Sequence, residues 1–384
     1  MAQTTKTPWR RRVPETTMPF IPDYRSTNAY QTLLFSRLES AGITPEPVAV
    51  GDLPALLRER AALPDPGVLN VQWTTPLVQR AKDPADAVRR RKKFIGLLDD
   101  FLTAGGRLIW TIHNVLPHEV EYREDEILLC RFLADRATYV HVLSAETVDA
   151  VADLYPLDPD RVRIIPIASY AGWYPDTVTR DDARARLGLG PDDLVLTTVG
   201  GIRPYKGHSS LLDWFEPAAQ EDPSLRLLVA GRLSQHEGAE ELLRRLDHPA
   251  VVARPDFVPD EDLQVWYRAA DVAVLPYAAI LNSSAFWLAV TFGVPVVAPR
   301  LGGLAAFEDL PFVRLFDPEV EGELGRAIAS ACEDLVDPAR PEQWRERIQQ
   351  HAAEHGPVQM AQAFSDLVAE AARPPRRRRG RRRT

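Results

Sequence analysis

The sequence predicts an α/β protein of two Rossmann-like, doubly wound domains that face each other across a cleft. The chain has 384 residues, more than one ordinary hydrophobic core accommodates. Short apolar runs alternate with amphipathic stretches over residues 18–165 and again over residues 194–298, with a Pro-, Gly- and Asp-rich break between them. Strands and helices in regular succession are typical of parallel sheets covered by helices.

In the first half, apolar runs predict five strands, and two longer periodic segments predict helices. The helix expected over residues 30–41 carries Leu33, Leu34 and Leu38 at helical spacing. A second helix is expected over residues 85–104, where a pair of glycines ends it. The predicted strands are residues 18–22, 68–73, 107–112, 139–143 and 162–165.

The second half repeats this order after a short predicted helix capped at Asp181 and stopped by glycine. Longer helices are expected over residues 208–220, 260–270 and 284–292. A helical stretch over residues 342–372 closes the ordered chain. The predicted strands are residues 194–199, 225–230, 251–253, 272–276 and 294–298.

These patterns divide the chain into five segments. A basic, flexible N-terminus (1–17) precedes a first Rossmann-like domain (18–175). The second Rossmann-like domain (176–340) follows, then the closing helices (341–372), and an arginine-rich, disordered tail ends the chain (373–384).

Composition indicates an ordinary soluble protein. Hydrophobic residues make up 45% and charged residues 26% of the chain, and no apolar run approaches the roughly 20 residues that cross a bilayer. The N-terminal residues lack the apolar segment of a secretory signal. The two cysteines, Cys130 and Cys332, are far apart and show no metal-ligand spacing. We therefore expect a cytoplasmic protein that needs neither a metal nor a cofactor.

The charge distribution is uneven. The formal net charge is −8, but it becomes −16 when the eight arginines of residues 373–384 are left out. Clustered arginines repel one another and favour a solvated, disordered tail. The alternative is peripheral contact with the inner face of an anionic membrane. Nucleic acid is not an expected partner, because no aromatic side chain is interleaved with the arginines for base stacking.

The strongest local signal is the segment TTVGGIRPYKGHSSLL, residues 197–212. An apolar strand runs into Gly200 and Gly201, and Arg203 and Lys206 follow before the next helix. Glycines let an anion approach the backbone, and the N-terminus of a helix favours negative charge. The segment matches neither the Walker loop nor the dinucleotide fingerprint. It predicts a phosphate site, and a surface loop with two solvated cations remains the alternative.

This segment resembles the second domain of retaining GT-B glycosyltransferases, especially family 4. The resemblance continues through PDFVPDEDLQVWYRAADVAVLPY and FGVPVVAPRLGG and covers residues 194–303, with a weaker likeness in the first domain. It implies that Arg203 and Lys206 hold the diphosphate of a nucleotide-sugar, UDP- or GDP-linked, as catalytic groups. It also implies that the second domain (176–340) binds the donor and that the first (18–175) lies on the acceptor side. Gly200 and Gly201 would then belong to the donor site, and the backbone at Val258 would lie beside the nucleobase.

One departure from the family concerns two glutamates that normally contact donor hydroxyls. Aligned back from the GVPVVAP strand, their places hold Ile280 and Leu288. The chain instead offers Asn282, Ser283 and Ser284 at the start of a predicted helix, and these are candidates for donor binding. A plain helix cap is the alternative.

In the first domain, His113 and Asn114 follow a predicted strand and should face the crevice at its carboxyl end. The resemblance implies that His113 contacts the donor sugar and takes part in catalysis, and it places Asn114 on the acceptor side. His118 and Glu119 lie in the continuing loop. They could contact the acceptor, or Glu119 could cap the next helix.

The early loop DYRSTNAYQTLL resembles the segment that lines the acceptor side in the family. Asn28 and Tyr30 are the candidates there, and ordinary helix packing of Tyr30 is the alternative. Gln72 and Trp73 end a predicted strand, and Trp73 is expected in the core.

The predicted function is sugar transfer from a nucleoside-diphosphate sugar to an acceptor hydroxyl with retention. The acceptor would be a glycan, a lipid-linked sugar or a small molecule. A sugar-nucleotide 2-epimerase remains an alternative, as does an inverting transferase with Asp23 or Glu119 as base. An alternative of another class is a non-catalytic protein that binds sugar nucleotides.

Overall fold

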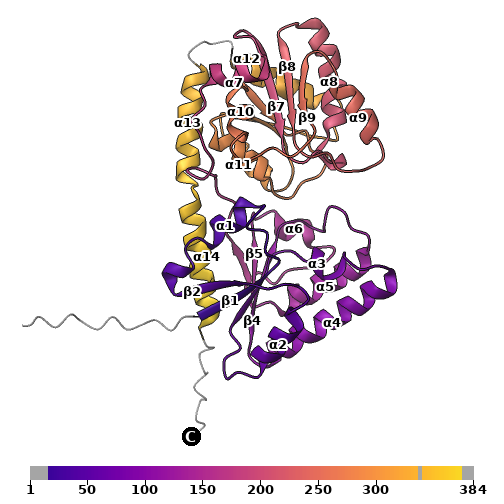
Figure 1. The fold of residues 1–384 in the computed structure, drawn as a ribbon, viewed down its shortest axis with the longest axis vertical. Coiled ribbons are helices and arrows are strands. Elements are labelled where there is room, and N and C mark those ends of the chain that lie inside the picture. The colour runs from indigo at the N-terminus through magenta and orange to yellow at the C-terminus, as the bar shows by residue number, and fades with distance from the viewer. Residues whose placement is uncertain (1–15, 336–339, 374–384) are drawn as a thin grey trace, which may run out of the picture.

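The computed structural model describes residues 16–335 and 340–373. It confirms the α/β prediction, because two separate parallel sheets of six strands each are stacked along the long axis of the molecule (Figure 1). The strand order is β2-β1-β3-β4-β5-β6 in the first sheet and β12-β11-β10-β7-β8-β9 in the second. The first sheet consists of β1 (Thr16–Ile21), β2 (Ile43–Pro47), β3 (Val68–Val71), β4 (Arg107–Ile112), β5 (Tyr139–Val142) and β6 (Val162–Ile164).

Helices cover both faces of the first sheet. Successive residues of β4 enter different cores, since Ile109 packs with Phe364 of the C-terminal helix whereas Leu108 packs with Phe94 of α4. The helices of this domain are α1 (Ala29–Phe35), α2 (Leu53–Ala61), α3 (Thr75–Val78), α4 (Pro84–Thr103), α5 (Arg123–Arg136) and α6 (Thr147–Val151), with a 3-10 turn, η1 (Glu39–Ala41).

The second sheet has the strand order typical of dinucleotide-binding folds. It consists of β7 (Leu194–Val199), β8 (Leu225–Ala230), β9 (Val251–Arg254), β10 (Val272–Val274), β11 (Val296–Pro299) and β12 (Val313–Phe316). Its helices are α7 (Arg180–Leu187), α8 (His208–Glu221), α9 (Ala239–Leu246), α10 (Leu263–Arg268), α11 (Ser284–Thr291) and α12 (Glu323–Glu333), with the 3-10 turns η2 (Pro204–Lys206) and η3 (Gly302–Phe307).

Two helices at the end of the chain connect the domains. α13 (Arg340–Glu354) packs against α11 of the second domain, and α14 (Pro357–Ala372) packs against α1, β3 and β4 of the first (Figure 1). The two helices are separated at Gly356, which has an extended backbone and precedes a proline. The closing helices predicted over residues 341–372 are therefore α13 and α14, and the second returns the chain to the first domain.

Several local predictions are wrong in informative ways. The helix expected over residues 30–41 ends at Phe35 and continues only as the turn η1. The short helix before β7 is capped by Thr179, whose side chain accepts a hydrogen bond from the Asp182 amide, and not by Asp181. The edge strand β2 was not predicted, because prolines occupy two of its five positions and tertiary pairing overrides their poor strand propensity.

The ends of the chain are only partly described. β1 begins at Thr16, inside the segment expected to be flexible, whereas residues 1–15 of that segment lie outside the described residues. Arg373 follows the end of α14, and the rest of the predicted tail, residues 374–384, also lies outside them. No helix in the described ranges is both long and apolar enough to cross a membrane.

Candidate functional site

A cleft of about 540 Å³ lies between the two domains and is lined by residues of both. In each sheet the chain reverses its direction of winding next to this cleft, between β1 and β3 in the first sheet and between β7 and β10 in the second. Loops at the carboxyl ends of such neighbouring strands form the ligand crevice of doubly wound sheets. Both domains therefore contribute their crevice loops to one site.

The second-domain part of the site is the loop after β7. Gly200 and Gly207 have φ angles of 130° and 66°, which favour glycine. A Cβ on Gly207 would lie 1.8 Å from the carbonyl oxygen of Pro276, so the loops after β7 and β10 approach too closely for any other residue. These two glycines bring Arg203 and Lys206 to the wall of the cleft, just before α8 begins.

Lys206 has no acidic partner in the part of the chain that the structure describes. It is half-buried, and no ion pair links it to any residue in the described ranges. Its Nζ lies 5.3 Å from the ring centre of Tyr277. Burial, and next the charge of Arg203, lower the pKa of Lys206 from 10.5 to about 8. A positive charge held in this way favours binding of an anion.

Arg203 does have a partner, and the partner belongs to the other domain. Its Nη1 donates to Oε1 of Glu119 over 2.9 Å, and both side chains are exposed. Next to this pair, the ring of His118 stacks on that of Tyr205, with centroids 4.2 Å apart and planes 9° apart. His118 and Glu119 thus contact the donor-side loop. Glu119 does not cap a helix, because α5 starts only at Arg123.

His113 lies on the opposite wall, directly after β4. Its ring is parallel to that of Trp73, with centroids 3.9 Å apart, and perpendicular to that of Tyr30. Burial, with a further contribution from His141, places the pKa of His113 well below its usual range. The imidazole is therefore neutral at pH 7 and can accept as well as donate a hydrogen bond.

A chain of buried amides orients this imidazole. Nε2 of His113 lies 2.9 Å from Oε1 of Gln72, and Nε2 of Gln72 donates to Oδ1 of Asn70. Asn70 in turn donates to the carbonyl oxygen of Ile109 in β4. In this arrangement Nε2 of His113 carries the proton, which leaves Nδ1 as an acceptor.

Asn28 and Tyr30, the candidates from the early loop, both line the cleft. Asn28 caps α1 by accepting from the Tyr30 amide. The Tyr30 hydroxyl is buried and has no hydrogen-bond partner in the described part of the chain. Trp73 was expected in the core, but it is only partly buried and lines the cleft, because β3 ends before it at Val71.

The predicted polar patch before α11 also lines the cleft. Ser283 caps the helix by accepting from the Phe286 amide, so the cap interpretation is correct for it. Asn282 reaches the other domain, since its Nδ2 donates to the carbonyl oxygen of His113 over 3.3 Å. Ser284 is exposed at the start of the helix. Asn114 completes the opposite wall.

Two predicted donor-site residues do not line the cleft. Gly200 lies behind Lys206, where an added Cβ would be 3.0 Å from Nζ. Val258 has its side chain buried in the second-domain core, and a role of its backbone beside a nucleobase stays a prediction. Glu119 approaches the cleft only through Arg203. Among the described residues that line the cleft, none is an aspartate or a glutamate.

The sequence did not predict that Gln72 orients His113 or that Tyr205 and Tyr277 line the cleft. Gln72 follows β3 at the same sheet edge where His113 follows β4, and this shared edge is a signal that could have paired them. Tyr205 lies within the phosphate motif itself. Tyr277 follows β10, but which strand neighbours β7 is known only from the folded sheet.

The chain is similar to known glycosyltransferases. Residues 193–334 match the family described as glycosyl transferases group 1. A D-inositol 3-phosphate glycosyltransferase of Corynebacterium efficiens is 33% identical over 218 residues, which are 51% of this chain and 50% of that protein. The chain thus spans about half the length of that curated relative.

Solved structures extend the likeness to nearly the whole chain. HepE of Anabaena in complex with UDP has a TM-score of 0.69 at 15% identity, covering 92% of this chain and 100% of that one. Sucrose-phosphate synthase of Thermosynechococcus elongatus has a TM-score of 0.65 at 18% identity, with coverages of 93% and 100%. These structures establish the two-domain GT-B fold. Within that fold, the match to the glycosyl transferases group 1 family lies in the second domain, over residues 193–334.

Proposed function

We propose that this protein transfers a sugar from a nucleoside-diphosphate sugar to an acceptor hydroxyl, with retention at the sugar carbon. The observation that carries the proposal is Lys206, a half-buried cation without an acidic partner in the described ranges, held at the carboxyl edge of β7 just before α8. A diphosphate would supply the missing negative charge. UDP is the leading nucleotide, because HepE of Anabaena was solved with UDP and with UDP-glucose.

The residues on the two walls would share the work. Arg203 and Lys206 would stabilise the charge that develops on the leaving diphosphate. His113, neutral and oriented by Gln72, would hold a donor hydroxyl through its free nitrogen. A diphosphate would compete with Glu119 for Arg203, which would couple donor binding to this contact between the domains.

The side chains around the cleft favour retention by front-face attack over the two other routes, double displacement and inversion. A double-displacement route needs a carboxylate nucleophile, and no carboxylate lines the described walls. An inverting route needs a positioned base, but both candidates are held by arginines. Asp23 pairs with Arg25 through both carboxylate oxygens, which lowers its pKa, and Glu119 pairs with Arg203. We therefore propose front-face attack, in which the leaving phosphate takes the acceptor proton.

A polyol phosphate is the first acceptor to test, because the curated relative is a D-inositol 3-phosphate glycosyltransferase. Glycans and lipid-linked sugars are the next. No metal or cofactor would be required, so a chelator should leave transfer unchanged.

The arginines of residues 373–384 would attach the acidic chain to an anionic membrane surface. Truncation after Ala372 should lower sedimentation with anionic vesicles at low salt and leave transfer to a soluble acceptor unchanged. Full-length protein that ignores such vesicles at low salt would remove the membrane role.

The deciding experiment is transfer by Lys206→Ala with a panel of UDP-, GDP-, ADP- and dTDP-sugars. Loss of a charged contact to the leaving group should cost about 2.7–4 kcal/mol, or two to three orders of magnitude in rate. Lys92→Ala, which removes an exposed lysine of α4, is the matched control. Near-native turnover of Lys206→Ala would show that the donor site is elsewhere. A protein that binds nucleotide-sugars without transfer, hydrolysis or epimerisation would be a non-catalytic binder, and one that releases the epimeric donor would be an epimerase.

A further inference from the structure

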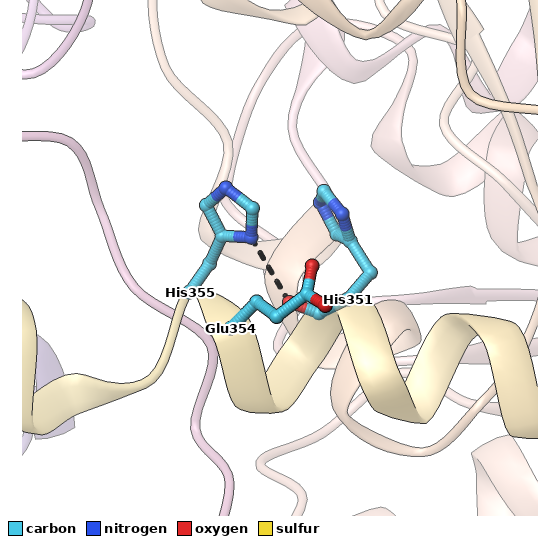
Figure 2. A group of neighbouring side chains, drawn as sticks. All are labelled: His351, Glu354 and His355. Carbon is cyan, nitrogen blue, oxygen red and sulfur yellow. Dashed lines mark hydrogen bonds between the residues drawn. The ribbon is translucent and has the colours of Figure 1, made fainter.

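The last turn of α13 and the residue that follows it carry three potential metal ligands. His351, Glu354 and His355 each present a ligand atom, and these atoms lie within 4.8 Å of one another (Figure 2). Residues four apart on a helix share one face, and residues three apart are neighbours there. Two histidines four apart are also the ligand pair of zinc-binding helices.

Each of the three side chains has an unused ligand atom. Nδ1 of His355 donates to the carbonyl oxygen of His351 over 3.0 Å, drawn as the dashed line in Figure 2, which leaves Nε2 as the acceptor. Metal-bound histidines are typically oriented by such a bond from the other ring nitrogen. Glu354 accepts from Gln350 through Oε1 only. Nε2 of His351 is shielded from solvent and has no hydrogen-bond partner among the described residues.

The surrounding aromatic rings keep both imidazoles in place. The ring of His351 lies parallel to that of Trp287, with centroids 5.8 Å apart, and 4.2 Å from the ring of His355.

We propose that His351, Glu354 and His355 bind one divalent transition-metal ion, with Zn²⁺ the best match. Two imidazole nitrogens and one carboxylate suit Zn²⁺, whereas Mg²⁺ and Ca²⁺ require oxygen ligands. Zn–N distances of about 2.0–2.1 Å require the ligand atoms to move closer together than they are. Glu354 and His355 are exposed and can rotate to do so. A water molecule would complete the coordination.

The position of this site gives the ion a structural task separate from the donor cleft. The carbonyl oxygen of His355 accepts from the Ser169 amide, and that of Ala352 accepts from the Ser169 hydroxyl, over 2.9 and 2.6 Å. Ser169 lies in the segment that leads from the first domain to the second. A bound ion would hold the end of α13 where this segment is attached. None of the three ligands lines the donor cleft.

Zn²⁺ binding by the untagged full-length protein tests the proposal. After chelator treatment and removal of the chelator, calorimetric titration should give one Zn²⁺ per chain, and Mg²⁺ should give no heat of binding. His355→Gln should weaken Zn²⁺ binding at least tenfold. His248→Gln, which removes a half-buried histidine outside the cluster, should leave it unchanged, as should Cys332→Ser, which removes a half-buried thiol.

Thermal unfolding supplies a second readout. Zn²⁺ should raise the Tm of the native protein and of both control variants, but not that of His355→Gln. His355 is exposed, so its substitution should not prevent folding, and this variant decides the case even if His351→Gln is unstable. Undiminished Zn²⁺ affinity in His355→Gln would overturn the proposal, and so would a native protein that takes up no Zn²⁺.

Discussion

Replacing Lys206 with methionine should stabilise the free protein while it weakens UDP binding. Methionine keeps the length of the side chain but not the charge. The pKa of Lys206 falls from 10.5 to about 8 on folding, chiefly because the charged form is desolvated, so the native state binds this proton more weakly than the unfolded chain does. The charge therefore opposes folding at pH 7.

The size of this effect follows from the pKa values. At about 1.4 kcal/mol per pH unit, a fall from 10.5 to about 8 corresponds to at most about 3.5 kcal/mol. Because Lys206 retains some contact with solvent, we expect a gain of about 1–2 kcal/mol for Lys206→Met. The gain should be complete below pH 8 and should disappear as the pH rises toward 10.5, where the unfolded chain also loses the proton.

Two assays on the same samples check the prediction. Urea unfolding at pH 7 and at pH 10 gives the free energy of unfolding, and calorimetric titration gives UDP affinity. UDP binding should weaken by about tenfold to 150-fold, the equivalent of about 1.5–3 kcal/mol for a charge-assisted hydrogen bond. Lys92→Met on α4 should change neither quantity by much. A Lys206→Met protein that is less stable at pH 7 yet binds UDP normally would refute both the desolvated lysine and the diphosphate site.

Two further predictions concern first-domain residues that contact the lining of the cleft. Glu119→Gln should tighten UDP binding by up to about fivefold at low salt, because loss of the ion pair frees Arg203 for a phosphate. The limit follows from the strength of an exposed ion pair, about 0–1 kcal/mol. Weaker UDP binding would mean that Glu119 itself helps to hold the ligand. Gln72→Leu should lower transfer but not UDP affinity, because His113 loses the acceptor that orients it. Combining it with His113→Ala should add little further loss in a double-mutant cycle, whereas fully additive losses would separate the two residues.

Much of the fold could be predicted from local patterns. Apolar runs such as residues 107–112 and 194–199 are buried strands, because parallel strands covered on both faces leave few positions for polar residues. The glycines around Arg203 and Lys206 marked a loop with an unusual backbone, and the positive φ angles of Gly200 and Gly207 agree with that interpretation. Edge strands were harder, because β2 and β12 depend on pairing with a neighbour more than on their own sequence.

What the sequence by itself determined is the location of the chemistry along the chain: a cationic loop after one strand and a histidine after another. Only the tertiary structure decided which groups meet. The bond from Asn282 to the His113 backbone joins residues 169 positions apart, and the pair of Arg203 with Glu119 joins residues 84 positions apart. Such contacts depend on how two independently folded sheets face each other. No local periodicity encodes that arrangement, because it is set by the cores and by the helix that returns from the second domain to the first.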